Sequence, residues 1–300
     1  MTAQPGGVGP AGATIHPIAA RAVVHALTAA ANTAGFAPSI PDSQPWRWRL
    51  TGNTLALHLD RTDIDHAVDA DGRLAIISCG AALHHARIAL AAAGWQFTMD
   101  RRPDPADPDR LASLRLVERR PAEPADAPLM SSIPMRRTDR TTVDGAPIVA
   151  AQLKAITSAV RGEETSLHVL YPDEVLDLAR AASGGRPFPS GAVDRSNGAG
   201  PSVSAHGRGA TFALLYGHTD EPEDWLRAGE ALSAGWLTAT TAGVSVLPLS
   251  AAVEVVATRQ AVQIMIGCVG YPYLLLRLGR AAMSPTGPRR APVVQVIDRR

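Results

Sequence analysis

The sequence predicts an α+β fold made of two related halves, with a central antiparallel or mixed sheet flanked by helices. Helical and strand-like patterns alternate along 300 residues, of which 46% are hydrophobic, enough apolar material for a large core. The run CGAALHHARIALAAAGW from Cys79 aligns without gaps on AGEALSAGWLTATTAGV from Ala228, an offset of 149 residues or half the chain. We interpret the repeat as a dimer fused into one chain, although two alanine-rich helices that end in glycine can also resemble each other by chance.

The first half is expected to span residues 18–125, after a flexible N-terminus at residues 1–17. Apolar spacing and a closing Gly35 predict a helix over residues 18–34, and Gly94 ends a second helix over residues 78–95. Alternation of apolar and polar residues around Gly52-Asn53 predicts a β-hairpin. The predicted strands of this half cover residues 48–59 (the hairpin), 96–99 and 114–116.

The second half is expected to span residues 126–300, after an exposed connection at residues 121–128 that is rich in proline, alanine and acid. Residues 183–209 contain glycine, serine and proline with almost no apolar periodicity, which predicts a mobile loop, either a lid or a plain surface loop. Gly270-Tyr271-Pro272 marks a break in the last section of the chain. The predicted helices are 148–160, 173–182, 223–242 and 255–267, and the predicted strands are 166–170, 210–216 and 292–297.

Charge and cysteine content narrow the class of protein. A formal net charge of +1 argues against broad electrostatic capture of nucleic acid. The two cysteines, Cys79 and Cys268, lie in apolar runs and imply no disulfide framework. The sequence has neither a secretory leader pattern nor about 18 uninterrupted apolar residues, so we expect a cytoplasmic protein without a membrane partner.

The segment APSIPDSQPW from Ala37 to Trp46 is the most informative motif in the chain. Its prolines stiffen a loop that presents Ser39, Asp42 and Gln44 just before a tryptophan. A stiff loop can place hydrogen-bonding groups against a planar ring at low entropic cost. The motif therefore predicts a binding site for a planar ligand.

This loop resembles the flavin-binding loop of the nitroreductase superfamily, P-S-x-x-N-x-Q-P-W, and most closely that of the Acg-like, dormancy-associated branch. The resemblance continues through SCGAALHHARIALAAAGW, Arg136-Arg137-Thr138-Asp139-Arg140, AGEALSAGWLTATTAGVSVLPLS, GYPYLLLRLG and PRRAPVVQVI, in the Acg-like order over roughly residues 20–298. It implies a nitroreductase-like fold that binds FMN and uses NAD(P)H as a transient co-substrate.

The resemblance also implies roles for individual residues. Ser39, Asp42 and Gln44 would approach the isoalloxazine ring, and Pro248, Leu249 and Ser250 would lie on its opposite side. Arg136, Thr138, Arg140 and Arg290 would bind the phosphate, since guanidinium groups donate bidentate, charge-assisted hydrogen bonds to phosphate. Taken without the loop motif, the same arginine run reads as a solvated surface stretch.

Two positions depart from the family pattern. Asp42 stands where the family has asparagine, and Pro41 precedes it where the Acg-like branch often has histidine. An ionised Asp42 about 5 Å from an anionic reduced flavin would repel it by roughly 3 kcal/mol at an effective dielectric near 20. We therefore expect Asp42→Asn to raise FMN affinity or the flavin reduction potential, unless burial raises the pKa of Asp42 and keeps it protonated.

Other chemistry is less well supported by the sequence. His84 and His85 with Cys79 make a poor metal site, because adjacent helical side chains point about 100° apart. The sequence contains no G-x-S-x-G, G-x-G-x-x-G or Walker motif, which argues against the commonest rival α/β enzymes.

Three functions remain open at this point. The first is an FMN-dependent oxidoreductase that passes hydride from NAD(P)H through flavin to a small-molecule acceptor such as a nitroaromatic or a quinone. The second is a non-catalytic protein that stores or sequesters FMN, and the third is a flavin-free relative that acts as an interaction protein. We assign no general acid or base, and we expect a monomer with an internal pseudo-dimer or a homodimer.

Overall fold

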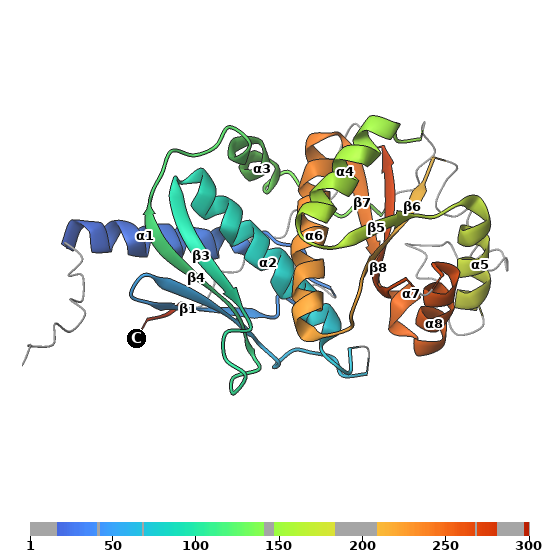
Figure 1. Cartoon of the computed structure of the whole chain (residues 1–300), viewed down its shortest axis with the longest axis horizontal. Coiled ribbons are helices and arrows are strands. Elements are labelled where there is room, and N and C mark those ends of the chain that lie inside the picture. Colours follow the sequence, from blue (N-terminus) through green and yellow to red (C-terminus); the bar gives the residue numbers. More distant parts are fainter. Residues whose placement is uncertain are drawn as a thin grey trace, which may run out of the picture.

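The computed structural model describes residues 17–40, 43–67, 69–140, 147–183, 209–267, 269–280 and 297–299. Two sheets lie on either side of a pair of central helices, α2 (Arg73–Ala92) and α6 (Pro222–Thr241) (Figure 1). The first sheet has the strand order β3-β4-β2-β1-β9 and the second the order β5-β6-β8-β7. Within the described residues, the architecture is the predicted α+β fold, with sheets flanked by helices.

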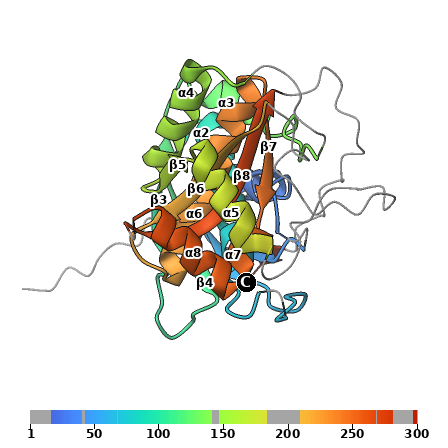
Figure 2. The same ribbon diagram turned by 90° about the vertical axis from the view of Figure 1, so that its right-hand side faces the viewer.

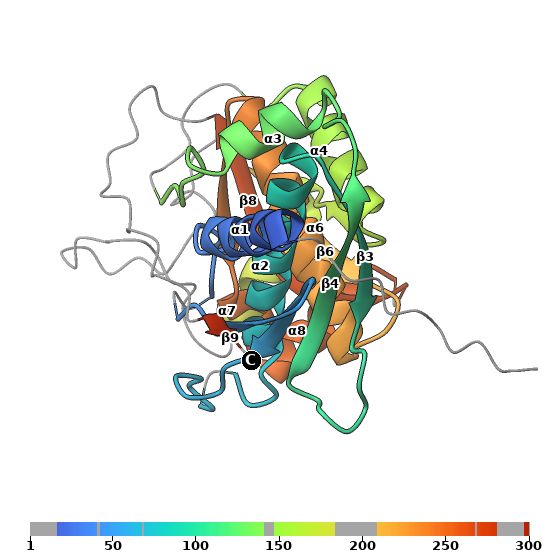
Figure 3. The ribbon, with the colours of Figure 1, turned by 90° about the vertical axis from the view of Figure 1, so that its left-hand side faces the viewer.

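The first half places α1 (Pro17–Ala34) and α2 against one face of its sheet, with α1 seen end-on in Figure 3. The predicted helix at 18–34 and the hairpin around Gly52 are confirmed. α3 (Asp126–Ser132) was not predicted and lies at the end of the exposed connection. The strands of this half are β1 (Trp46–Thr51), β2 (Thr54–Leu59), β3 (Trp95–Arg101) and β4 (Arg110–Arg119).

The second half carries two insertions that the first half lacks. α5 lies between β5 and β6, and α7 with α8 lies between β7 and β8; α5 and α8 pack together over the outer face of the sheet (Figure 2). The helices are α4 (Ala150–Gly162), α5 (Pro172–Ser183), α7 (Ala251–Glu254) and α8 (Val256–Met265). The strands are β5 (Ser166–Val169), β6 (Thr211–Gly217), β7 (Val244–Leu249) and β8 (Tyr271–Arg280), with β9 (Ile297–Arg299) closing the chain.

Several predicted boundaries were wrong. α2 begins at Arg73 rather than at residue 78, because the Asp69 carboxylate accepts hydrogen bonds from the Leu74 and Ala75 N–H groups and starts the helix earlier. The predicted helix at 255–267 corresponds to α8, which covers residues 256–265, while the short α7 before it was not predicted; the extended backbone of Val255 separates the two helices. β7 and β8 were missed altogether, and much of the predicted mobile loop and of the closing strand falls outside the described residues.

α2 is the central helix of the core. By length and composition it could span a membrane, but 89% of that apolar stretch is buried inside the protein. It packs against α6 so closely that a Cβ on Gly80 would lie 2.0 Å from the Leu226 carbonyl oxygen, and one on Gly229 would lie 1.9 Å from the Ile77 carbonyl oxygen. These two glycines therefore allow backbone-to-backbone contact between the halves.

The two halves repeat the same topology. α2 and α6 begin 149 residues apart and end 149 residues apart, and each is followed by a glycine with a left-handed backbone, Gly94 and Gly243. The order β3-β4-β2-β1 in one sheet matches β7-β8-β6-β5 in the other. The Gly80 and Gly229 contacts are reciprocal at the same offset, as in an interface with two-fold symmetry. β9 breaks the repeat by adding to the first sheet, parallel to β1.

Candidate functional site

The loop between α1 and β1, residues 35–45, carries three of the predicted ligand contacts. The Ile40 N–H donates to Ser78 Oγ at 2.9 Å and the Cys79 thiol donates to the Pro45 carbonyl at 3.0 Å, so α2 holds the loop at two points. Asp42 and Pro41 lie outside the described residues.

Two polar atoms of this loop are buried and have no hydrogen-bond partner among the described residues. They are Ser39 Oγ and Gln44 Oε1. A buried polar group without a partner costs roughly 1–3 kcal/mol, and such groups in native proteins call for an explanation such as a bound ligand. The sequence places both in the ligand-binding motif, so the geometry fits a group that exchanges hydrogen bonds with this loop.

Gln44 also has a left-handed backbone, with φ of 51°. A residue with a Cβ is strained in this region by about 1 kcal/mol, and such strain is concentrated at functional sites. The conformation turns the chain into β1, where the Trp46 N–H donates to the Gln44 carbonyl at 2.8 Å. The left-handed backbone of Gln44 therefore fixes the direction in which its side chain leaves the loop.

The arginine segment, residues 136–140, meets this loop and the edge of the second sheet. Arg136 donates to the Phe36 carbonyl at 3.1 Å, and its guanidinium carbon lies 4.6 Å from the centre of the Trp236 ring. Thr138 pairs with Val246 of β7 in a parallel bridge. The segment thus joins the first half to the second at the place where the predicted site residues from both halves should meet.

The residues Pro248, Leu249 and Ser250 lie at the end of β7 and lead into α7. Because Thr138 pairs in parallel with Val246, the chain direction carries the exposed Arg140 towards Pro248. The arginine segment therefore runs alongside β7 in the direction of the 248–250 segment. Arg290 lies outside the described residues.

Sequence reasoning missed Arg277, a buried arginine on β8 that donates to the Asp139 carbonyl at 2.7 Å. Burial lowers the pKa of Arg277, and the nearby Asp139 partly offsets that effect. Its signal in the sequence was a single arginine inside the apolar run YLLLRLG. Its contact fixes the backbone of the arginine segment against the second sheet.

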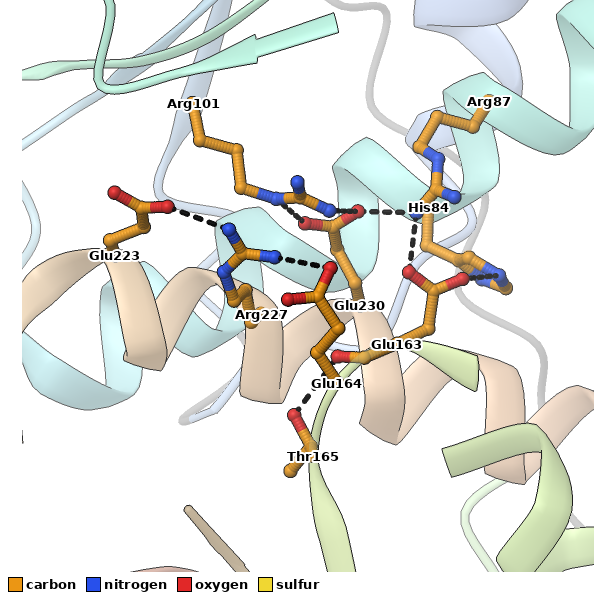
Figure 4. A network of polar contacts seen from close by, with 9 residues as sticks. All are labelled: His84, Arg87, Arg101, Glu163, Glu164, Thr165, Glu223, Arg227 and Glu230. Carbon is orange, nitrogen blue, oxygen red and sulfur yellow. Dashed lines mark hydrogen bonds and ion pairs between the residues drawn. The ribbon is translucent and has the colours of Figure 1, made fainter. Parts of the chain in front are cut away.

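The loop between α4 and β5, residues 163–165, is the equivalent of the 35–45 loop in the second half. Glu164 has φ of 57° and stands two residues before β5, as Gln44 stands two residues before β1. Arg101 corresponds to Ser250 at the 149-residue offset. Arg101 and Glu164 belong to a network of polar contacts between the halves (Figure 4).

The carboxylate of Glu230, which is fully buried, is the centre of that network. Arg101 donates to it from Nε at 2.7 Å and from Nη2 at 3.1 Å, and Arg87 bonds both Glu230 and Glu163. Glu164 pairs with Arg227 at 2.9 Å. Burial raises the pKa of Glu230, while its hydrogen bond to Arg101 and the charge of Arg87 oppose that shift.

His84 joins the network at the contact between α2 and α6. Its Nδ1 lies 2.8 Å from Ser233 Oγ, and its Nε2 lies 3.6 Å from Glu163 Oε1. Burial, followed by the charge of Arg87, lowers the pKa of His84 to about 3, so the ring is neutral at pH 7. His84 and His85 are both buried.

Comparisons with known proteins add sequence relatives. No protein-family model matches the chain. The chain is 35% identical to a Mycobacterium tuberculosis H37Rv protein named "Putative NAD(P)H nitroreductase Rv3131", over 99% of this chain and 97% of that protein. It is 33% identical to "Putative NAD(P)H nitroreductase acg" of the same strain, over 90% of this chain and 95% of that protein. The solved structure of an FMN-bound nitroreductase from Bacteroides fragilis aligns with a TM-score of 0.41 at 16% identity, covering 54% of this chain and 92% of that one.

Proposed function

The chain belongs to the nitroreductase superfamily, in the branch that contains Acg and Rv3131, and from that premise we propose that it is an FMN-dependent oxidoreductase. Both relatives carry the name "Putative NAD(P)H nitroreductase", and their alignments cover 99% and 90% of this chain. Bound FMN would supply the hydride and electron transfer that such a reaction needs. The chain's own residues would supply binding and orientation.

The observation that carries this proposal is the pair of unpartnered polar atoms in the 35–45 loop. Ser39 Oγ and Gln44 Oε1 are both buried, and the strained Gln44 backbone holds one of them in place. The edge of an isoalloxazine ring offers both hydrogen-bond donors and acceptors, which fits a hydroxyl and an amide. The match supports FMN as the ligand of this loop.

Roles for the other predicted residues follow from their positions. Thr138 and Arg140 are exposed next to the end of β7 and suit the phosphate, together with Arg290, while Pro248, Leu249 and Ser250 suit the far side of the ring. Arg136 suits the phosphate less well than the sequence implied, because its guanidinium donates to Phe36 and stacks on Trp236. We assign Arg136 to joining the flavin loop to the arginine segment.

The substrates would be NAD(P)H and a small electron acceptor of the nitroaromatic or quinone type. Within the described residues we assign no side chain as general acid or base. Catalysis would then depend on how firmly the protein positions the flavin loop, the arginine segment and the substrates.

The direct test is anaerobic reduction of the FMN-loaded protein. NADPH or NADH should bleach the flavin absorbance, and a nitroaromatic or a quinone added afterwards should restore it. Flavin that stays bound but is not reduced by either nucleotide would contradict an oxidoreductase and favour FMN storage. A protein that remains colourless after incubation with FMN would favour a flavin-free interaction protein, and Asp42→Asn would then show whether the departure at Asp42 is the cause.

A further inference from the structure

Ser78 and Cys79, neighbours on α2, contact the motif that carries Ser39 and Gln44 at two points. Ser78 Oγ receives the Ile40 N–H at 2.9 Å, one residue after Ser39, and the Cys79 thiol bonds the Pro45 carbonyl at 3.0 Å, one residue after Gln44. Both side chains are buried, at 1% and 0% exposure. Two consecutive residues of α2 therefore hold the motif immediately after Ser39 and immediately after Gln44.

The Ser78 hydroxyl is held in one orientation by a second hydrogen bond. It donates to the Leu74 carbonyl at 2.7 Å, one helical turn back, and this leaves its lone pairs for the Ile40 N–H. Proline residues flank Ile40 on either side at positions 38 and 41, and proline has no N–H to donate. The Ile40 N–H is therefore one of the few main-chain donors in this part of the loop. Its hydrogen bond to Ser78 anchors the main chain there.

The Cys79 thiol anchors the loop in the same way at Pro45, next to Gln44. The Pro45 carbonyl accepts from the thiol and also from the Asp60 N–H at 3.0 Å, just after β2. Burial, and then the charge of Asp60, raises the pKa of the Cys79 thiol, so the group keeps the proton that this contact uses. The carbonyl therefore ties the end of the loop to both α2 and the first sheet.

The repeat shows what the same turn does in the second half. Arg227 and Ala228 occupy the equivalent positions on α6 at the 149-residue offset. Arg227 makes an ion pair with Glu164 of the equivalent loop, and Ala228 has no polar group to offer. The serine and cysteine pair is thus particular to the half whose loop has unpartnered polar atoms.

We propose that Ser78 and Cys79 are positioning residues that fix the flavin loop at Ile40 and at Pro45, so that the neighbouring Ser39 and Gln44 meet the ligand in a preset geometry. This inference rests on the proposed function, because it takes FMN as the ligand of the loop. Holding a binding loop in its bound conformation increases affinity by reducing the ordering cost of binding. The pair would therefore determine FMN affinity without touching FMN.

The first test needs no flavin. Hydrogen exchange at the Ile40 amide, measured on the full chain, should be at least about ten times faster in Ser78→Ala than in the unaltered protein, because the amide loses its acceptor. Ser78→Thr, which retains a hydroxyl, should restore most of the protection. Equal exchange at Ile40 in the unaltered protein and in Ser78→Ala would overturn the anchoring role.

The second test is FMN affinity, measured by fluorescence titration. Ser78→Ala should weaken binding about 5- to 30-fold and Cys79→Ala about 2- to 10-fold, with Ser78→Thr close to the unaltered protein. Ser233→Ala is the matched control, since Ser233 is also a fully buried, hydrogen-bonded helical serine but lies at the contact between α2 and α6. It should leave FMN affinity unchanged at a similar loss of unfolding free energy.

The outcomes separate this inference from the proposed function. FMN binding that is equally tight in Ser78→Ala and in the unaltered protein, with faster Ile40 exchange, would overturn the inference and leave the flavin assignment intact. A weakening shared equally by Ser233→Ala would mean a general loss of stability and would also overturn it. Failure of the unaltered protein to bind FMN would overturn both.

Discussion

The loops that follow α1 and α4 occupy equivalent places in the two halves, yet their polar groups are in opposite states. In the 35–45 loop, Ser39 Oγ and Gln44 Oε1 are buried without a partner among the described residues. In the 163–165 loop, Glu163 and Glu164 are engaged by arginines from both halves. Both loops have the same left-handed turn before the strand. The polar side-chain atoms lack hydrogen-bond partners in the first loop and are paired with arginines in the second.

This difference indicates where a repeated framework can accept a ligand. In the second half, Glu163 of the equivalent loop shares Arg87 with the buried Glu230, which also accepts from Arg101. A ligand there would have to displace buried ion pairs, and separating a buried pair costs several kcal/mol. We therefore expect one FMN for each chain, although the fold repeats.

The largest effect is expected from breaking the network. Glu230→Ala removes a carboxylate with 0% exposure, leaves Arg101 without its carboxylate partner and leaves Arg87 with Glu163 alone, so the free energy of unfolding should fall by about 3–5 kcal/mol. Urea unfolding measures the loss. Glu164→Ala is the control, because that side chain is 71% exposed and should change the unfolding free energy little. A small loss of unfolding free energy in Glu230→Ala would contradict the view that Glu230 is the centre of a buried ion-pair network.

The two-fold relation itself can be tested at the contact of α2 with α6. Gly80→Ala and Gly229→Ala should each lower the unfolding free energy by about 3 kcal/mol, since each new Cβ would meet a backbone carbonyl of the facing helix. The two losses should be similar because the contacts are reciprocal. Gly162→Ala, with open space around its Cβ, should cost nothing. Clearly unequal losses at Gly80 and Gly229 would break the comparison of the halves.

Substitution of the two left-handed residues separates ligand binding from stability. Gln44→Gly and Glu164→Gly should each relieve backbone strain of about 1 kcal/mol, partly offset by the greater entropy of glycine in the unfolded chain. Only Gln44→Gly should weaken FMN binding, by about 5- to 30-fold, through loss of its amide. Isothermal titration with FMN, alongside urea unfolding, measures both. An equal effect of the two variants on FMN binding would remove the distinction between the loops.

A smaller effect is expected from pH through His84. Its pKa of about 3 in the folded protein lies below the ordinary 6.5, so the unfolded chain takes up a proton first as pH falls. The stabilisation is complete above pH 6.5 and is lost progressively between pH 6.5 and 3, at up to about 1.4 kcal/mol for each pH unit. His84→Gln should flatten the decline between pH 7 and 5.5 by about 1 kcal/mol in urea unfolding. An unchanged slope would show that His84 is not held neutral.

Much of this fold could be predicted from local patterns, and the misses have physical causes. α2 was predicted too short because residues 73–79 are all buried, which removes the periodicity that marks one face of a helix. β8 was missed because Tyr271-Pro272 looked like a turn. Pro272 is the second residue of the strand, opposite Tyr216 at a register shift, where the ladder tolerates a proline.

The candidate site was predictable where it lies in one stretch of sequence and not where it depends on distant contacts. Ser39 and Gln44 could be selected from the loop motif alone. The hydrogen bond from Arg277 to Asp139 joins residues 138 positions apart, and the hydrogen bond from Ile40 to Ser78 joins residues 38 positions apart. No local pattern reveals such pairs. The network around Glu230 was missed for the same reason, since its members come from α2, β3, α6 and the 163–165 loop.

The most direct test of the difference between the two loops is the amount of FMN that the chain retains. The protein would be incubated with excess FMN, separated from free ligand by gel filtration, and assayed for flavin absorbance against protein concentration. We predict one FMN for each chain, and less retained FMN in Gln44→Gly but not in Glu164→Gly. Two FMN molecules for each chain, or none, would contradict the account.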